Sequence, residues 1–155
     1  MRAHRLPKPH LGIGDDAALL SDRADGEYSV VTTDSLMDGV HFELDKVDAR
    51  RIGRKLVNVN LSDLAAMGAK PETLFLSLCL PMDSQHTTDF LASEIFEGVC
   101  EVAEEYEVAL AGGDTNCWSG PLVLHLTAIG KTGGQASWLR SNAQPDDLIV
   151  VTGKL

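Results

Sequence analysis

Hydrophobic and polar positions divide the chain into short apolar runs separated by longer amphipathic segments. Residues 29–33 (SVVTT) form a short β-branched run, which predicts a strand that ends directly at Asp34. Residues 73–80 (TLFLSLCL) form a dense apolar run closed by Pro81, which predicts a strand buried on at least one face. Further runs predict shorter strands at residues 108–111, 122–129 and 147–152.

Two segments between these runs have helical spacing. The first follows Asp48, a predicted cap, and continues until Gly68 and Pro71 stop it. Its apolar stripe consists of Ile52, Leu56, Val59, Leu64 and Met67. The second segment, residues 90–106, has an apolar stripe and an acidic remainder, so its acidic run is expected to be a solvated face.

The element order is β-α-β-α-β-β, followed by one further strand. This order predicts an α/β (α+β) fold, an open sandwich of ferredoxin-like type in which two main helices cover a mixed sheet. The final predicted strand runs directly into Gly153, where a connection into further structure is expected. We therefore expect one domain over residues 1–146 and the start of a truncated second domain over residues 147–155.

Composition limits the possible partners. The 155 residues are 44% hydrophobic and 23% charged, as expected for one globular domain. The formal net charge is -10 with 13 Lys and Arg in total, which disfavours a nucleic-acid partner. No apolar run approaches the roughly 20 residues of a membrane span, and the basic start lacks a signal-peptide core. A cytoplasmic protein without a membrane partner is predicted.

An acidic protein can bind ATP if carboxylates first collect divalent cations. Three acidic positions adjoin glycine turns or predicted strand ends and a fourth lies late on the first predicted helix, and we expect the ends of these elements to be neighbours in one sheet. They are Asp16, Asp34, Asp63 and Asp114. For Asp16 and Asp34 an ordinary turn or cap role is the commoner reading, and for Asp114 the two readings are balanced. Together they predict a metal site.

Asp63 is the most informative of the four carboxylates. It lies among apolar residues of its predicted helix, and no Lys or Arg stands three or four positions away to pair with it. Burying an unpaired carboxylate is costly unless a cation or strong hydrogen-bond donors compensate.

Four ordered stretches resemble signatures of the thiamine-monophosphate kinase family, within the aminoimidazole ribonucleotide synthetase-like superfamily. They are GIGDDAA at residues 12–18, TDSLMDGVHF at 33–42, VNLSDLAAMGA at 59–69 and LAGGDT at 110–115. The resemblance covers the chain from about Leu11 to its end. Other superfamily members share the helical aspartate and the glycine turns, but the NLSDLAAMGA wording and the His41-Phe42 pair are most similar to the thiamine enzymes.

The resemblance implies the N-terminal domain of that fold and ATP-dependent phosphorylation of thiamine monophosphate to thiamine diphosphate with several Mg2+ ions. It implies metal ligands at Asp16, Thr32, Thr33, Asp34, Asp63 and Asp114. It further implies ATP contacts at Gly113, Asp114 and Arg140, and a substrate contact at His41, with no catalytic residue beyond the metal ligands. On their own, His41 and Arg140 are more readily an ordinary histidine and a solvated loop arginine.

Some features depart from the family pattern. Family members continue into a second domain that adds a metal-binding aspartate and much of the substrate pocket, so this polypeptide is expected to be an inactive fragment. Only some ten residues precede Leu11, where the family usually has an N-terminal helix. Asn142 and Asp146 stand where the family commonly has glycines.

The resemblance also implies a homodimer in which two N-terminal domains join their sheets near the nucleotide. Two alternatives to the kinase stay open. One is another ATP-using member of the superfamily, similar to selenophosphate synthetase or a purine-biosynthesis synthetase. The other is a non-catalytic nucleotide-binding dimerisation module.

Overall fold

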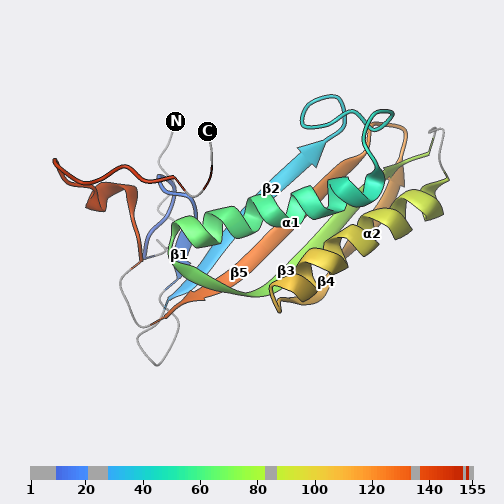
Figure 1. Ribbon diagram of the computed structural model, residues 1–155. Coiled ribbons are helices and arrows are strands. Elements are labelled where there is room, and N and C mark those ends of the chain that lie inside the picture. The colour runs from blue at the N-terminus through green and yellow to red at the C-terminus, as the bar shows by residue number, and fades with distance from the viewer. Residues whose placement is uncertain (1–9, 21–27, 83–86, 134–136, 152, 154–155) are drawn as a thin grey trace, which may run out of the picture.

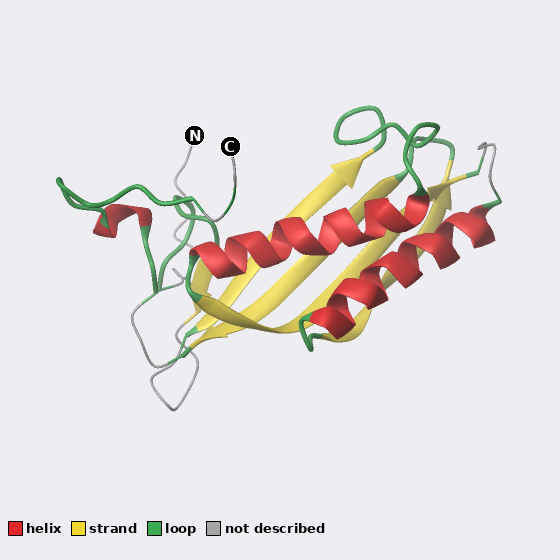
Figure 2. Ribbon diagram, in the orientation of Figure 1, coloured by secondary structure: helices red, strands yellow, loops and turns green. Residues whose placement is uncertain are grey.

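The protein folds as a five-stranded sheet with two long helices across one face (Figures 1 and 2). A computed structural model describes residues 10–20, 28–82, 87–133, 137–151 and 153. The elements in chain order are β1 (Ala18–Leu20), β2 (Ser29–Met37), α1 (Ala49–Ala66), β3 (Ala69–Pro81), α2 (Thr88–Glu105), β4 (Ala109–Trp118), β5 (Val123–Thr132) and the 3-10 turn η1 (Arg140–Asn142).

The strand order is β1-β2-β5-β3-β4, and the sheet is mixed. Strand β2 pairs antiparallel with β1 and β5, and β3 pairs antiparallel with β5 but parallel with β4. A parallel pair needs a crossover connection, which α2 supplies between β3 and β4. The predicted open sandwich with a mixed sheet and two main helices is confirmed.

Several predicted strand ends were wrong because pairing extends the strands. Strand β2 continues past Asp34 to Met37, since β5 supplies partners along its whole length. Strand β4 runs through the paired glycines to Trp118 alongside β3. Strand β1 was not predicted, because three residues are too few to give a periodic signal.

The last predicted strand is also wrong over its described residues. Residues 147–151 form no strand, and Leu148, Ile149, Val150 and Val151 are 55 to 99% exposed. Thr152 lies outside the described residues. An apolar run becomes a strand only where a neighbouring strand accepts its hydrogen bonds, and this segment runs apart from the sheet (Figure 1).

Both helices begin at capping side chains and cross each other closely. Asp48 accepts from the backbone N of Arg50 at 2.8 Å, as predicted for a cap, and Thr87 accepts from that of Phe90 at 3.3 Å. A Cβ added at Gly53 would lie 2.2 Å from the carbonyl oxygen of Ile95. The two helix backbones therefore touch where both helices carry glycine.

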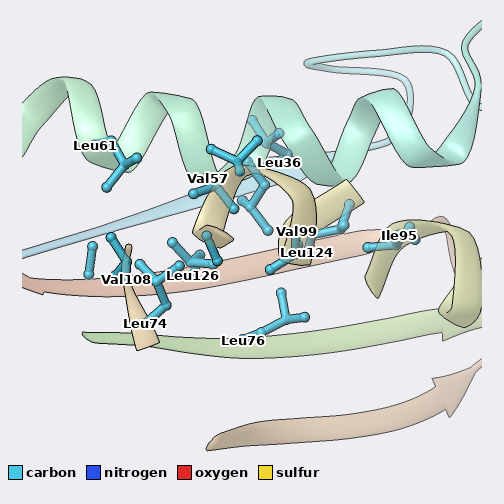
Figure 3. Packing of buried hydrophobic residues seen from close by; sticks show 14 of the residues in the cluster. Leu36, Val57, Leu61, Leu74, Leu76, Ile95, Val99, Val108, Leu124 and Leu126 are labelled. Atoms are coloured by element: carbon cyan, nitrogen blue, oxygen red, sulfur yellow. The ribbon is translucent and has the colours of Figure 1, made fainter. Parts of the chain in front are cut away.

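The core lies between the helices and one face of the sheet (Figure 3). Leu56, Ile95 and Leu126 are fully buried there, and each such side chain contributes about 1.5–3 kcal/mol. Along β5 the buried residues alternate with half-buried ones on the opposite face. No described helix or strand covers that second face (Figure 2). No described helix is long and apolar enough to cross a membrane.

Candidate functional site

A hydrogen bond between Thr32 and Asp63 joins β2 to the last turns of α1. The Thr32 hydroxyl donates to Oδ2 of Asp63 at 2.6 Å, and Thr32 is itself buried. Thr32 occupies the helix-facing side of β2, in the same alternation as Val30 and Leu36. The local sequence thus presents a hydroxyl to the carboxylate from beneath the helix.

The electrostatic environment of Asp63 is unfavourable to its charged form. Partial burial raises the pKa of Asp63, and the negative charges of Asp34 and Asp16 raise it further. The hydrogen bond from Thr32 and the positive charge of Arg140 act in the opposite direction. The net effect is a raised pKa of Asp63. Asp16, Asp34 and Asp63 form what we call the Asp63 group, and this group holds more negative charge than its protein surroundings compensate.

Arg140, at the start of η1, pairs with Asp16 of the Asp63 group. Its guanidinium donates to both carboxylate oxygens of Asp16, from Nε at 3.3 Å and from Nη2. Its backbone N donates to Asp15 at 3.2 Å. This pairing lowers the pKa of Asp16 below its usual value, through the side-chain hydrogen bond first. Asp15 was not singled out from the sequence, because nothing local predicts a contact 125 residues away.

Thr33 and Asp114 lie apart from this group. The side chain of Thr33 faces the uncovered side of the sheet, where its hydroxyl contacts Nε2 of His125 at 2.9 Å. Asp114 lies on β4, where it pairs in register with Ser77 of β3. Strand β4 is three strands from β2 in the sheet order, so the two strands lie about 14 Å apart at ordinary strand spacing. The single chain therefore does not assemble the four predicted carboxylates, and neither Asp34 nor Asp114 ends its strand.

Gly113 and Asp114 line a groove of about 710 Å³ between β4 and α2. A Cβ on Gly113 would lie 1.6 Å from the carbonyl oxygen of Leu76, so only glycine lets β4 approach β3 this closely. The Asp114 carboxylate accepts from the amide of Asn116 at 2.6 Å. Leu76 and Phe96 supply apolar walls.

His41 lies beyond the end of β2, in the loop that leads to α1. Its Nδ1 accepts from the backbone N of Met37 at 3.1 Å, which assigns the proton of the neutral ring to Nε2. The loop borders a cavity of about 320 Å³ lined by His41, Glu43 and Lys46. His41 is thus separate from the Asp63 group along β2.

The donor chemistry around Asp63 fits a hard cation. Thr32, Asp34, Asp63 and Asp16 present only oxygen atoms, which Mg2+ prefers. Among the described residues, however, no three His, Cys, Asp or Glu side chains form a complete metal-ligating group. Mg2+ commonly binds through one or two carboxylates plus substrate phosphates, so a nucleotide would strengthen a site that the protein alone offers only in part.

Comparison with known proteins identifies a family and several similar kinases. The profile of the family AIR synthase related protein, N-terminal domain, matches residues 14–132. A thiamine-monophosphate kinase of Rhodopirellula baltica is 40% identical over 99% of this chain and 49% of its own length. That of Bacillus subtilis is 38% identical over 94% and 43%, and that of Escherichia coli 39% identical over 99% and 44%. The chain spans about half the length of the curated relatives it matches.

Solved structures agree with this result. The structure of AaThiL complexed with AMPPCP and TMP matches with TM-score 0.69 and 30% identity, over 77% of this chain and 37% of that one. Thiamine-monophosphate kinase from Stenotrophomonas maltophilia matches with TM-score 0.63 and 49% identity, over 81% and 38%. A hydrogenase maturation protein, HypE, shares the fold at 22% identity and TM-score 0.59, over 84% and 39%. The chain belongs to the family of AIR synthase related proteins, whose N-terminal domain it carries over residues 14–132.

Proposed function

We propose that this chain forms the nucleotide- and Mg2+-binding domain of a kinase that phosphorylates thiamine monophosphate to thiamine diphosphate at the expense of ATP. The observation that carries the proposal is 40% identity over 99% of the chain to a thiamine-monophosphate kinase. A relative with 30% identity was solved with AMPPCP and TMP bound, which supports this pair of ligands. The proposal concerns the residues of this chain, which spans about half of such relatives.

The Asp63 group is the proposed centre of phosphate binding. Asp16, Asp34 and Asp63 would hold Mg2+, and the Thr32 hydroxyl fixes one oxygen of Asp63. When bound, Mg2+ supplies charge neutralisation and in-line orientation for phosphoryl transfer. The acceptor is a phosphate oxygen that is already anionic at neutral pH, so a general base is not required. We accordingly assign no catalytic residue beyond the metal ligands.

Gly113 and Asp114 would serve a separate part of the nucleotide site on the helix-covered side of the sheet, whereas Thr33 would meet a ligand only on the uncovered side. Asp114 lies three strands from Asp34, so the two carboxylates would not share one ion within a single chain. The proposal of several ions, rather than one, is compatible with this separation. Gly113 and Asp114 line the groove against α2, which offers apolar walls beside backbone polar groups.

Arg140 would change partners when nucleotide binds. In the protein alone it neutralises Asp16. A cation that takes Asp16 would release the guanidinium, whose planar donors suit a phosphate group. His41 would donate from Nε2 to the phosphate of thiamine monophosphate, since Nδ1 is already engaged.

A homodimer through the uncovered sheet face is part of the proposal. Phe75 and Met37 lie on that face and are 39% and 37% exposed, and nearly every residue of the edge strand β4 is exposed. Unpaired strand edges and apolar strand faces are commonly covered by association. Phe75→Asp should therefore shift the chain towards monomer in sedimentation velocity, and an unchanged dimer fraction would argue against this face.

The alternatives have weaker support. Similarity to the hydrogenase maturation protein is 22% identity and bears on the fold alone. A non-catalytic nucleotide-binding module would bind nucleotide without binding thiamine monophosphate. Thiamine monophosphate binding is therefore the property that separates the proposed kinase domain from this alternative.

Calorimetric titration of the purified chain tests the proposal. We expect the non-hydrolysable analogue AMPPCP to bind only with Mg2+ present, and Asp63→Asn to abolish that binding. Asp45→Asn removes an exposed carboxylate from the loop before α1 and is the matched control. Binding that is equal with and without Mg2+, or equal in both variants, would contradict the assignment of the Asp63 group. A second titration with thiamine monophosphate tests the substrate.

A further inference from the structure

Lys55 connects α1 to the loop that carries His41. Its ammonium group donates to the carbonyl oxygen of His41 at 2.8 Å. We infer that Lys55 is a positioning residue that fixes His41 for contact with the phosphorylated substrate. The inference rests on the proposed function, because it takes His41 as the substrate contact.

Three hydrogen bonds define the position of His41. Its backbone N donates to the carbonyl oxygen of Met37 at 2.9 Å, and its Nδ1 accepts from the backbone N of Met37. Both of these tie His41 to the end of β2. The third, from Lys55, ties it to a different element, so it fixes the loop relative to the helix.

The other half of the loop is anchored in a different way. Asp38 accepts from the backbone N of Leu44 at 2.9 Å, and its own backbone N donates to Leu122 at the same distance. Gly39 adopts φ +78°, which allows the sharp turn. These contacts hold the start and the end of the loop, but they do not hold the His41 carbonyl. Within the loop, Gly39 also donates to the carbonyl oxygen of Phe42 at 2.8 Å, so the contact left to Lys55 is the one to the His41 carbonyl itself.

The contact matters for the ring because the backbone and the imidazole are coupled. If the backbone at His41 shifts as a whole, Nδ1 can lose its 3.1 Å bond from the backbone N of Met37, and the neutral ring can then carry its proton on either nitrogen. Only the form protonated at Nε2 offers a donor pointing away from the β2 end. Lys55 thus preserves a donor at Nε2 without touching the substrate itself.

The exposure of Lys55 argues against a mainly stabilising role. The side chain is exposed, and ordering a long exposed side chain returns little stability. The main consequence of the Lys55–His41 bond is therefore the orientation of the loop. Arg51 lies one turn earlier on the same helix face, is also exposed, and has the same charge. It provides a control for the effect of charge alone.

The test compares Lys55→Met with Arg51→Met and Lys55→Arg in the purified chain. Nitrogen NMR of the His41 ring near pH 8 measures the fraction of the Nε2–H form, and calorimetry measures affinity for thiamine monophosphate. We expect Lys55→Met to mix the two ring forms and to weaken binding about tenfold, the effect of losing one charge-assisted hydrogen bond. Arg51→Met should change neither quantity, and Lys55→Arg should restore both.

The other possible results contradict the inference or one part of it. An unchanged ring form in Lys55→Met would overturn the inference, and so would equal losses of affinity in Lys55→Met and Arg51→Met. A changed ring form with unchanged affinity would overturn the link to substrate. If the unmodified chain binds no thiamine monophosphate, this half-length chain does not form the substrate site by itself, while the ring form alone still decides whether Lys55 positions His41.

Discussion

Replacing Asp63 by asparagine should stabilise the folded chain at neutral pH while removing its response to Mg2+. The pKa of Asp63 is raised in the folded protein, because burial and the nearby charges of Asp34 and Asp16 disfavour its ionised form. A folded state with a raised carboxyl pKa binds protons more tightly than the unfolded state does. Stability therefore falls as pH rises from the unfolded value, about 3.9, through the folded one.

The expected magnitude follows from the contacts of the group. Asparagine is nearly isosteric and can still accept the 2.6 Å hydrogen bond from Thr32, so little packing is lost. What disappears is the cost of ionising a partly buried carboxylate beside two others. Relief of such a charge is worth about 1 kcal/mol, which corresponds to about 2–4 °C in Tm for a chain of this size.

The assay is thermal unfolding followed by circular dichroism at pH 7.5 and at pH 4, with and without Mg2+. The gain in Tm for Asp63→Asn should be present at pH 7.5 and smaller at pH 4, because the raised pKa brings the wild-type carboxyl closer to its protonated form there. Mg2+ should raise the Tm of the wild type and of Asp45→Asn but not of Asp63→Asn. A lower Tm for Asp63→Asn at pH 7.5 without Mg2+ would refute the reasoning, since it would mean that Thr32 and Arg140 outweigh the cost of burial.

Three further predictions concern other contacts. Gly98→Ala places a methyl group 2.0 Å from the carbonyl oxygen of Arg50 and should lower the unfolding free energy by about 2 kcal/mol in urea denaturation, whereas the exposed Asn58→Ala should not. Arg140→Met should tighten binding of Mg2+ alone, because Asp16 loses its counter-ion, but weaken binding of Mg2+ with AMPPCP in calorimetry; parallel changes would count against a partner exchange. Glu101→Gln removes the negative charge that pairs with Arg50 and Arg54 at 2.7 Å, so it should lower Tm slightly at low salt and not at high salt.

The long periodic elements could be predicted from the sequence, because their signals are local. The stripe from Ile52 to Met67 and the cap at Asp48 define α1, and the dense run at residues 73–80 marks most of β3. Strand ends could not be predicted in the same way. Strand β4 crosses Gly112-Gly113 because β3 pairs alongside it, and that pairing is not visible in the local sequence.

The candidate site was predicted only in part, for a related reason. The absence of a neighbouring Lys or Arg identified Asp63 as a carboxylate in need of compensation, and its raised pKa has the same physical origin. The partners of these groups are distant in sequence: Thr32 is 31 residues from Asp63, and Arg140 is 124 residues from Asp16. The position of Asp114 across the sheet depended on strand order, which the motifs do not encode.

Helix α1 links the two halves of the proposed reaction site. Lys55 reaches the His41 loop and Asp63 reaches Thr32, and eight residues of helix separate them by about 12 Å along the axis. Two residues before Lys55, at Gly53, α1 touches the backbone of α2, so the position of α1 depends on that contact. A displacement of α1 would therefore alter the proposed ion-binding carboxylate and the proposed substrate-binding loop together.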